Sequence, residues 1–203
     1  VGGLALAASD DGHSNVAVGY NAIGTGNCAD NNVAVGVNAL LVATASENVA
    51  VGKAALEAFT GSNATAVGSG AADALTTGIR NTAVGYDALG GTDDGGYNVA
   101  VGYGALLANC GDANTAVGVS SLDAFTGSNA TAIGYGAAVS ATTAGYLTAI
   151  GRNALGSMTD GTGNTAVGYD ALSTNLTTGD YNTAVGQAAG QDVYGDHNTF
   201  VCR

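Results

Sequence analysis

This sequence has few basic residues, no long apolar run and no recognisable signal-peptide pattern. Lysine and arginine together number four against sixteen acidic residues, which gives a net charge of −12. Because phosphate contacts require Lys and Arg, we expect no nucleic-acid partner. No apolar run approaches the ~20 residues of a membrane-spanning helix, so we expect no membrane span. The chain begins at Val1 without Met or a signal peptide, which suggests a processed protein or part of a longer one.

Proline and tryptophan are also absent, whereas glycine is frequent. Glycine contributes 34 residues without the Gly-X-Y period of collagen, and 46% of residues are hydrophobic, mostly small Ala and Val. This composition argues against an ordinary globular domain and allows only a thin core. The acidic residues are scattered through expected loops, where they would keep the surface soluble.

A short motif recurs along the whole chain. Asn-Val-Ala-Val-Gly or Asn-Thr-Ala-Val-Gly begins at eight asparagines, and looser copies fill the gaps between them. A period this short and regular indicates a solenoid. We therefore predict an all-β fold, a parallel β-solenoid (β-roll or β-helix) of about 12 coils of 16–18 residues. The glycines that close the motif are Gly19, Gly36, Gly52, Gly68, Gly85, Gly102, Gly118, Gly134, Gly151, Gly168 and Gly186.

A longer period lies over the short one. Residues 55–72 match residues 121–138 almost letter for letter, 66 positions later. We interpret residues 1–203 as a single β-solenoid domain that arose by duplication. Its internal four-coil modules are expected at about 3–68, 69–134 and 135–202.

Alternation within the motif predicts a short strand with two faces. The position before the glycine is always β-branched and aliphatic, so we expect it to face the core, together with the Val/Thr position two residues earlier. The alanine between them would then point outward and, with the glycines, offer a smooth face to another solenoid. The column expected in the core is Val18, Val35, Val51, Val67, Val84, Val101, Val117, Ile133, Ile150, Val167, Val185 and Val201.

Two further columns complete each coil. The third residue after the glycine is usually Ala and the fourth usually Leu or Ile, which predicts a second inward segment. Asparagine stands at the strand entrance in nine of the twelve coils. Stacked amides form ladders in such coils, so we predict a structural role for these side chains.

The three cysteines do not form a disulfide framework. Cys28, Cys110 and Cys202 fall in the first, sixth and twelfth coils. Strands stacked ~4.8 Å apart would separate Cys28 from Cys110 by roughly 24 Å. A disulfide needs Cα atoms within about 7 Å, so none can pair within one straight solenoid, and pairing between chains stays open.

The motif Asn-x-Ala-(Val/Ile)-Gly-x-x-Ala resembles the head repeat of trimeric autotransporter adhesins. The longer form at residues 81–89, Asn-Thr-Ala-Val-Gly-Tyr-Asp-Ala-Leu, resembles repeats of phage-type tail-fibre proteins. The resemblance covers essentially the whole chain. It implies a left-handed parallel β-roll, three chains packed side by side, a role in attachment, and a location that is extracellular, on the cell surface or on a virion. The neck, stalk and membrane anchor of adhesins and the self-cleaving chaperone of tail fibres have no counterpart in these residues.

No pattern supports catalysis or a cofactor. His13 and His197 lie about eleven coils apart, whereas a catalytic or metal constellation must converge. The Asp-rich turns at 10–12, 93–95 and 160–161 could donate oxygens to calcium, but they match neither the EF-hand nor the nonapeptide calcium repeat. We therefore predict a non-enzymatic protein without a cofactor, and favour solvated turns over calcium sites.

One aromatic column could face a partner. The position after the glycine carries Tyr20, Tyr86, Tyr103, Tyr135 and Tyr169. If exposed, this stripe suits stacking on sugars or on a neighbouring chain; the alternative is that each ring caps a coil edge with its hydroxyl in water. N-glycosylation patterns begin at Asn63, Asn129 and Asn175.

The leading functional expectation is a structural protein that forms a rigid extracellular or virion fibre. It would assemble with itself as a lateral trimer or as a head-to-tail filament, with a cell-surface glycan or receptor as a further partner. Broken coils at the two ends expose unpaired strand edges, which are templates for another chain. The expected end-to-end contacts are Val1, Gly2, Leu4, Leu6, Asn198, Phe200, Val201 and Cys202.

A binding module is the alternative, either for carbohydrate along the tyrosine stripe or for ice along a threonine ladder. An ice-binding face needs its threonines outward. In the expected strand phase the threonine column shares the side of the core, which argues against ice binding. The threonines concerned are Thr82, Thr115, Thr131 and Thr148.

Overall fold

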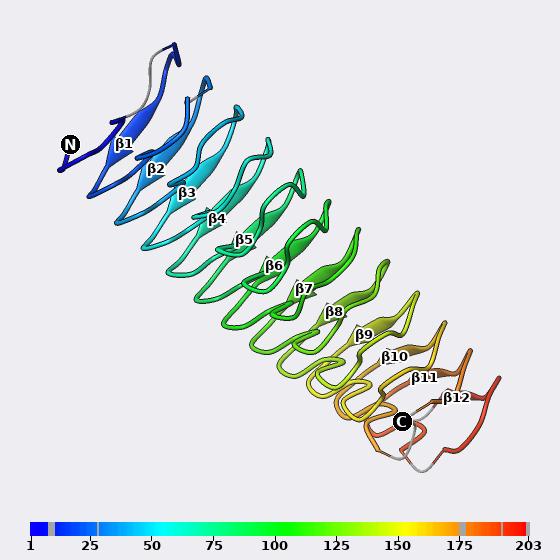
Figure 1. Cartoon of the computed structure of the whole chain (residues 1–203). Coiled ribbons are helices and arrows are strands. Elements are labelled where there is room, and N and C mark those ends of the chain that lie inside the picture. The colour runs from blue at the N-terminus through cyan, green and yellow to red at the C-terminus, as the bar shows by residue number, and fades with distance from the viewer. Residues whose placement is uncertain (8–10, 28, 175–177, 192, 202–203) are drawn as a thin grey trace.

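Twelve parallel strands of three residues each stack in chain order into one sheet (Figure 1). The computed structural model describes all residues except 8–10, 28, 175–177, 192 and 202–203. The strands are β1 (Val16–Val18), β2 (Val33–Val35), β3 (Val49–Val51), β4 (Thr65–Val67), β5 (Thr82–Val84), β6 (Val99–Val101), β7 (Thr115–Val117), β8 (Thr131–Ile133), β9 (Thr148–Ile150), β10 (Thr165–Val167), β11 (Thr183–Val185) and β12 (Thr199–Val201). The predicted all-β parallel solenoid is thus confirmed, with one strand per coil and about 11 turns.

Neighbouring strands pair without any shift in register. Ala34 of β2 lies beside Ala50 of β3, and Ala83 of β5 beside Ala100 of β6. Equivalent residues of successive coils therefore form straight columns along the stack. Among the described strands, contacts join only immediate neighbours, which is the one-dimensional organisation of a repeat protein.

The two faces of the strands are the reverse of the sequence expectation. The central alanine is fully buried in β2 through β11, as Ala34 and Ala100 illustrate, whereas Val35 is 36% exposed and Ile133 41% exposed. The prediction that the Val/Ile column faces the core is wrong, and so is the smooth outer face of alanines. The interior of the coil is narrow, and large side chains from the opposite wall already fill it. Only a methyl group fits beneath the sheet.

That opposite wall is the segment after the glycine, where the predicted inward Ala and Leu column is confirmed. Leu40, Leu56 and Leu89 are fully buried, and the backbone of each is left-handed, with φ of 48°, 52° and 58°. The segment is a succession of turns and not a strand. Left-handed leucines are uncommon, so burial of the large side chain stabilises a conformation that is otherwise unfavourable.

The asparagine ladder is present as predicted. Asn81 is buried, and its Nδ2 donates to the carbonyl oxygens of Gly78 at 2.9 Å and Gly95 at 2.8 Å. Its Oδ1 accepts from the backbone N of Asn98 in the next coil at 2.8 Å. Each such amide therefore satisfies loop carbonyls and joins one coil to the next.

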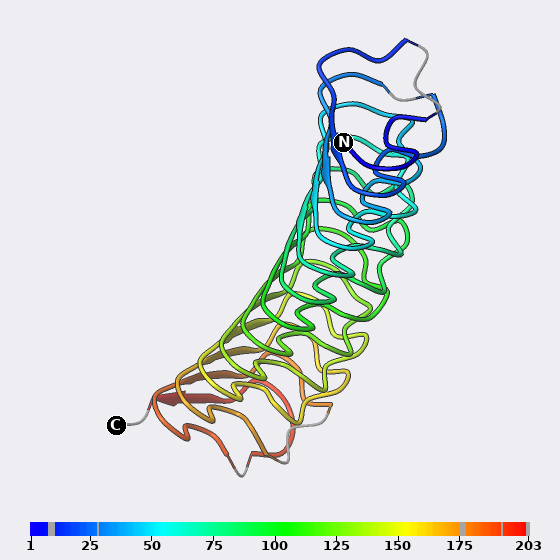
Figure 2. The same cartoon turned by 90° about the vertical axis from the view of Figure 1, so that its left-hand side faces the viewer.

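The stack is elongated, and its described ends lie at opposite extremes (Figure 2). Strands at the two extremes point in different directions, so the sheet twists along its length. Within the described part of the chain, no helix is long and apolar enough to cross a membrane.

Candidate interaction surface

The outward side of the sheet forms a continuous strip of β-branched residues, which we call the sheet face. It consists of the first and third residues of every strand, and none of these residues is charged. Exposed fractions such as 42% for Val18, 37% for Val84 and 40% for Val185 recur along its length. Valine and isoleucine make up most of this strip and threonine the rest. Contiguous exposed apolar surface of this kind is typical of surfaces at which proteins associate.

Two columns border the sheet face. The leading border is the residue just before the asparagine position, and the trailing border is the residue just after the glycine. All described members are exposed except Gly163, which is partly buried. The leading border is Ser14, Asn31, Glu47, Asn63, Arg80, Tyr97, Ala113, Asn129, Tyr146, Gly163, Tyr181 and His197. The trailing border is Tyr20, Val37, Lys53, Ser69, Tyr86, Tyr103, Val119, Tyr135, Arg152, Tyr169 and Gln187.

Charge is distributed very unevenly around the solenoid. The chain has four basic residues, and three of them, Lys53, Arg80 and Arg152, lie in the borders; Arg203 lies outside the described residues. The chain also has sixteen acidic residues, yet Glu47 is the one described acid in the sheet face and borders. The negative charge is therefore concentrated on the other sides of the coil.

The predicted tyrosine stripe is the trailing border, and all five of its tyrosines are exposed. The ring faces of four of them are partly covered, by another tyrosine or by an arginine. Tyr86 and Tyr103 stack with centroids 5.3 Å apart, and the Arg152 guanidinium lies 5.7 Å from the Tyr135 ring and 5.6 Å from the Tyr169 ring. These contacts hold the side chains in order and leave less ring surface for a sugar to stack on.

A second aromatic column, in the leading border, was missed from the sequence. Arg80 Nη1 donates to the Tyr97 hydroxyl at 2.7 Å, and its guanidinium lies 5.4 Å from the ring centroid. Tyr181 stacks on His197 at 5.2 Å. The signal was available, because Tyr97, Tyr146 and Tyr181 all stand immediately before the strand-entrance position.

The other predicted site residues are dispersed. Asn63 and Asn129 are exposed in the leading border, and Asn175 lies outside the described residues. Cys110 is free and buried, and burial raises the pKa of its thiol; Cys28 and Cys202 lie outside the described residues. His13 and His197 are exposed in the first and last coils.

The residues predicted for end-to-end contact divide between surface and core. Val1, Leu4 and Val201 are strongly exposed, at 92%, 56% and 77%. Phe200 and Leu6 are partly buried and pack against the core. Asn198 belongs to the asparagine ladder, because its backbone N donates to Asn182 Oδ1. Gly2 is exposed, and Cys202 lies outside the described residues.

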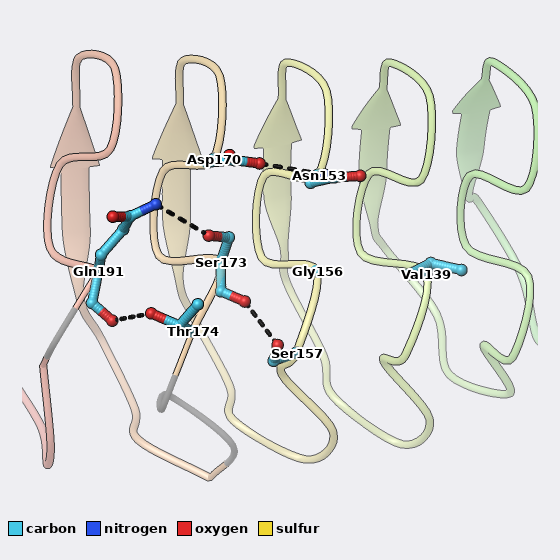
Figure 3. Close-up of a pocket in the computed structure, with 8 residues that line it drawn as sticks. All are labelled: Val139, Asn153, Gly156, Ser157, Asp170, Ser173, Thr174 and Gln191. Carbon is cyan, nitrogen blue, oxygen red and sulfur yellow. Dashed lines mark hydrogen bonds between the residues drawn. The ribbon is translucent and has the colours of Figure 1, made fainter.

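A shallow groove of about 340 Å³ lies along the turns of the last coils (Figure 3). Its polar groups are bonded from coil to coil. Asn153 Nδ2 donates to Asp170 Oδ1 at 3.1 Å, the Ser157 hydroxyl donates to the Ser173 carbonyl, and the Thr174 hydroxyl donates to the Gln191 carbonyl. These groups already have hydrogen-bond partners in the neighbouring coil. We therefore interpret the groove as a feature of the coil stacking and not as a ligand site.

Carboxylates off the sheet face occupy two kinds of environment. Burial, together with the charges of Asp87 and Glu57, raises the pKa of Asp73. Hydrogen bonds from the Thr142 and Thr143 hydroxyls lower the pKa of Asp160. Among the described residues no group of three or more His, Cys, Asp or Glu could hold a metal ion.

Comparison with protein-family models, curated proteins and solved structures found no match to this chain. Its class is therefore defined by the fold alone: it is a parallel β-solenoid of repeats about 17 residues long.

Proposed function

We propose that this chain is a non-catalytic structural protein that assembles side by side with copies of itself into a rigid rod, with the sheet face as the interface. The observation that carries the proposal is the uncharged β-branched strip on an otherwise acidic chain. Burying apolar surface drives association, and the net charge of −12 opposes contact through any other side. A second copy is therefore the occupant that best fits this face.

The size of the face is sufficient for a stable contact. Eleven strand spacings of ~4.8 Å give a length of ~53 Å, and four outward columns ~6.6 Å apart give a width of ~20 Å. The resulting ~1,000 Å² per chain exceeds the ~800 Å² per partner of a typical specific interface.

The location and the attachment role that we propose for this rod rest on the repeat motif. The resemblance of the repeat to adhesin heads and tail-fibre proteins supports an extracellular, cell-surface or virion location and a role in attachment to a glycan or receptor. Three chains side by side is the arrangement that the resemblance implies.

Introducing charge into the sheet face tests the proposal. Val84 and Ile150 are each 37% exposed, so Val84→Glu with Ile150→Glu should leave the fold intact. We expect the association constant from sedimentation velocity to fall at least about tenfold, because burying unpaired carboxylates costs several kcal/mol. Leu107→Glu is the matched control, since Leu107 is 38% exposed but lies off the sheet face. Its association should equal that of the wild type.

Two results would refute lateral assembly. One is a wild-type chain that stays monomeric at all concentrations tested; the other is a charged variant that associates like the control. Negative-stain images separate the head-to-tail alternative, because lateral assembly gives rods of one length near ~53 Å, whereas a filament has no fixed length.

Ice binding is a second candidate, favoured by the outward threonines. Thr82, Thr115, Thr131 and Thr148 lie on the sheet face and not toward the core, so the argument against ice drawn from strand phase is wrong. The twist of the sheet weighs against a match to a flat crystal plane (Figure 2). A thermal-hysteresis assay decides, and activity that is lost in Thr82→Lys with Thr131→Lys would favour ice over self-assembly.

A further inference from the structure

We infer that neighbouring copies lie parallel and in register, with the leading border of one chain against the trailing border of the next. This inference rests on the proposed side-by-side assembly and assigns its direction. Three contacts between chains would fix the register, each joining residues that flank the same strand: Glu47 to Lys53 at β3, Arg80 to Tyr86 at β5, and Tyr146 to Arg152 at β9.

Symmetry determines which borders can meet. Consider two or more parallel chains that turn their sheet faces toward a common symmetry axis. Rotation about that axis places the leading border of each chain against the trailing border of its neighbour, at the same height along the stack. An antiparallel pair is related by an axis across the stack. It sets like border against like border, at mirrored heights.

The residues at these heights are chemically complementary in the parallel arrangement. Glu47 and Lys53 have opposite charges and are both exposed. At β5 and β9 an arginine meets a tyrosine ring, which is a favourable cation–π pair. All three described basic residues of the chain therefore find a suitable partner at their own coil.

These pairs cannot form within one chain. Their members lie six positions apart on opposite sides of a strand, and at ~3.3 Å per extended residue the two borders are ~20 Å apart. The arginines are also held in place beforehand, because Arg80 stacks on Tyr97 and Arg152 lies between Tyr135 and Tyr169. Ordered side chains lose less entropy when a second copy binds.

The antiparallel arrangement lacks this complementarity. With the stacks fully overlapped, β3 lies opposite β10 and β5 opposite β8. Glu47 would then face Gly163, and Arg80 would face Asn129, both of them uncharged. The only described acid in the borders would be buried without a cation, which is unfavourable.

A charge-reversal cycle tests the pairing. Glu47→Lys and Lys53→Glu, made singly, each place like charges at β3 and should weaken association about three- to tenfold at ~0.05 M salt. The double variant Glu47→Lys with Lys53→Glu restores opposite charges between chains and should recover most of the wild-type constant. At ~0.5 M salt the differences should shrink, because the ions screen the pair. Circular dichroism checks that every variant is folded.

A pair of alanine variants tests the contact at β9. Tyr146→Ala should weaken association, whereas Tyr194→Ala should not, since Tyr194 is similarly exposed at 75% against 70% but lies off the borders. Single reversals without effect, or a double reversal without recovery, would overturn the parallel register while wild-type association still upheld the proposed function. A monomeric wild type would refute the proposed function itself.

Discussion

At the scale of the residue, the buried amides are the polar elements that make one coil depend on the next. Asn81 makes three hydrogen bonds within a fully buried environment, two to loop carbonyls and one from the following coil. Three coils lack the asparagine. Two of them carry Ala64 or Ala130 instead, each five residues after a buried phenylalanine, Phe59 or Phe125, and the third carries the buried Leu147. Large apolar side chains thus accompany the loss of the amide.

Asn81→Ala should therefore be strongly destabilising, because no phenylalanine accompanies it. It would leave two carbonyl oxygens and one N–H buried without partners, and we expect the free energy of unfolding in urea to fall by about 2–4 kcal/mol. Asn109→Ala is the control: Asn109 is exposed and accepts one bond from Asp93 N, so its loss should cost less than about 1 kcal/mol. Equal effects of the two changes would contradict the role assigned to the ladder.

At the scale of the element, the corner after each strand depends on glycine. Gly85 has φ of +140°, and a Cβ built on it would lie 2.3 Å from the carbonyl oxygen of Gly102 in the next coil. Since the obstacle is backbone, no side chain can move aside to relieve it. The corner thus sets both the direction of the chain and the close contact between coils.

Gly85→Ala should lower the free energy of unfolding by more than about 3 kcal/mol, because the positive φ and the backbone clash add. Gly145→Ala provides a matched comparison. Its Cβ would meet no atom within 4 Å and its φ is not positive, so we expect a change within about 1 kcal/mol and favourable in sign. Urea midpoints of the two variants check this, and a tolerated Gly85→Ala would mean that the corner can be remade without glycine.

The same elements explain what the sequence could and could not predict. The strand positions follow from the motif, because each Val/Thr-Ala-Val/Ile segment became a strand. Alternation with a period of two defines the two faces of a strand but does not determine which face is buried. Hydrophobicity alone favours the face with the larger Val and Ile residues, and that face is the exposed one. Uniformity is a better signal: the central residue is alanine from Ala17 to Ala184, whereas the residue before it is valine in some coils and threonine in others. A position that tolerates one size only is packed, and one that exchanges a methyl for a hydroxyl is partly solvated.

The borders could be located only in part, for a related reason. The trailing tyrosines follow an invariable glycine, so their column is visible in the sequence. The leading tyrosines precede the strand-entrance position and end loops of unequal length, so the column they form is less regular in the sequence. The uneven distribution of charge became visible only after both columns had been placed on one side of the sheet.

At the scale of the whole molecule, coils that contact only their neighbours should be removable in whole modules. Deleting residues 69–134 joins Gly68 to Tyr135 and lets β4 take the place of β8 beside β9. The sequence around the junction hardly changes, because residues 55–72 match residues 121–138. We expect a folded solenoid shorter by four strand spacings, or ~19 Å, measurable by small-angle X-ray scattering.

Deleting residues 69–126 removes a similar length but breaks the phase. It joins Gly68 to Gly127, so β8 would begin only eight residues after β4 begins, about half a coil. The columns of glycine, asparagine and alanine would no longer coincide across the junction, and we expect loss of the cooperative unfolding transition. The in-phase chain should also associate more weakly than the full chain, because the sheet face loses four of its twelve strands while the Glu47 and Lys53 pair at β3 is retained. An in-phase deletion that unfolds would show that the modules are not interchangeable. One that folds yet associates as strongly as the full chain would place the interface outside the deleted coils.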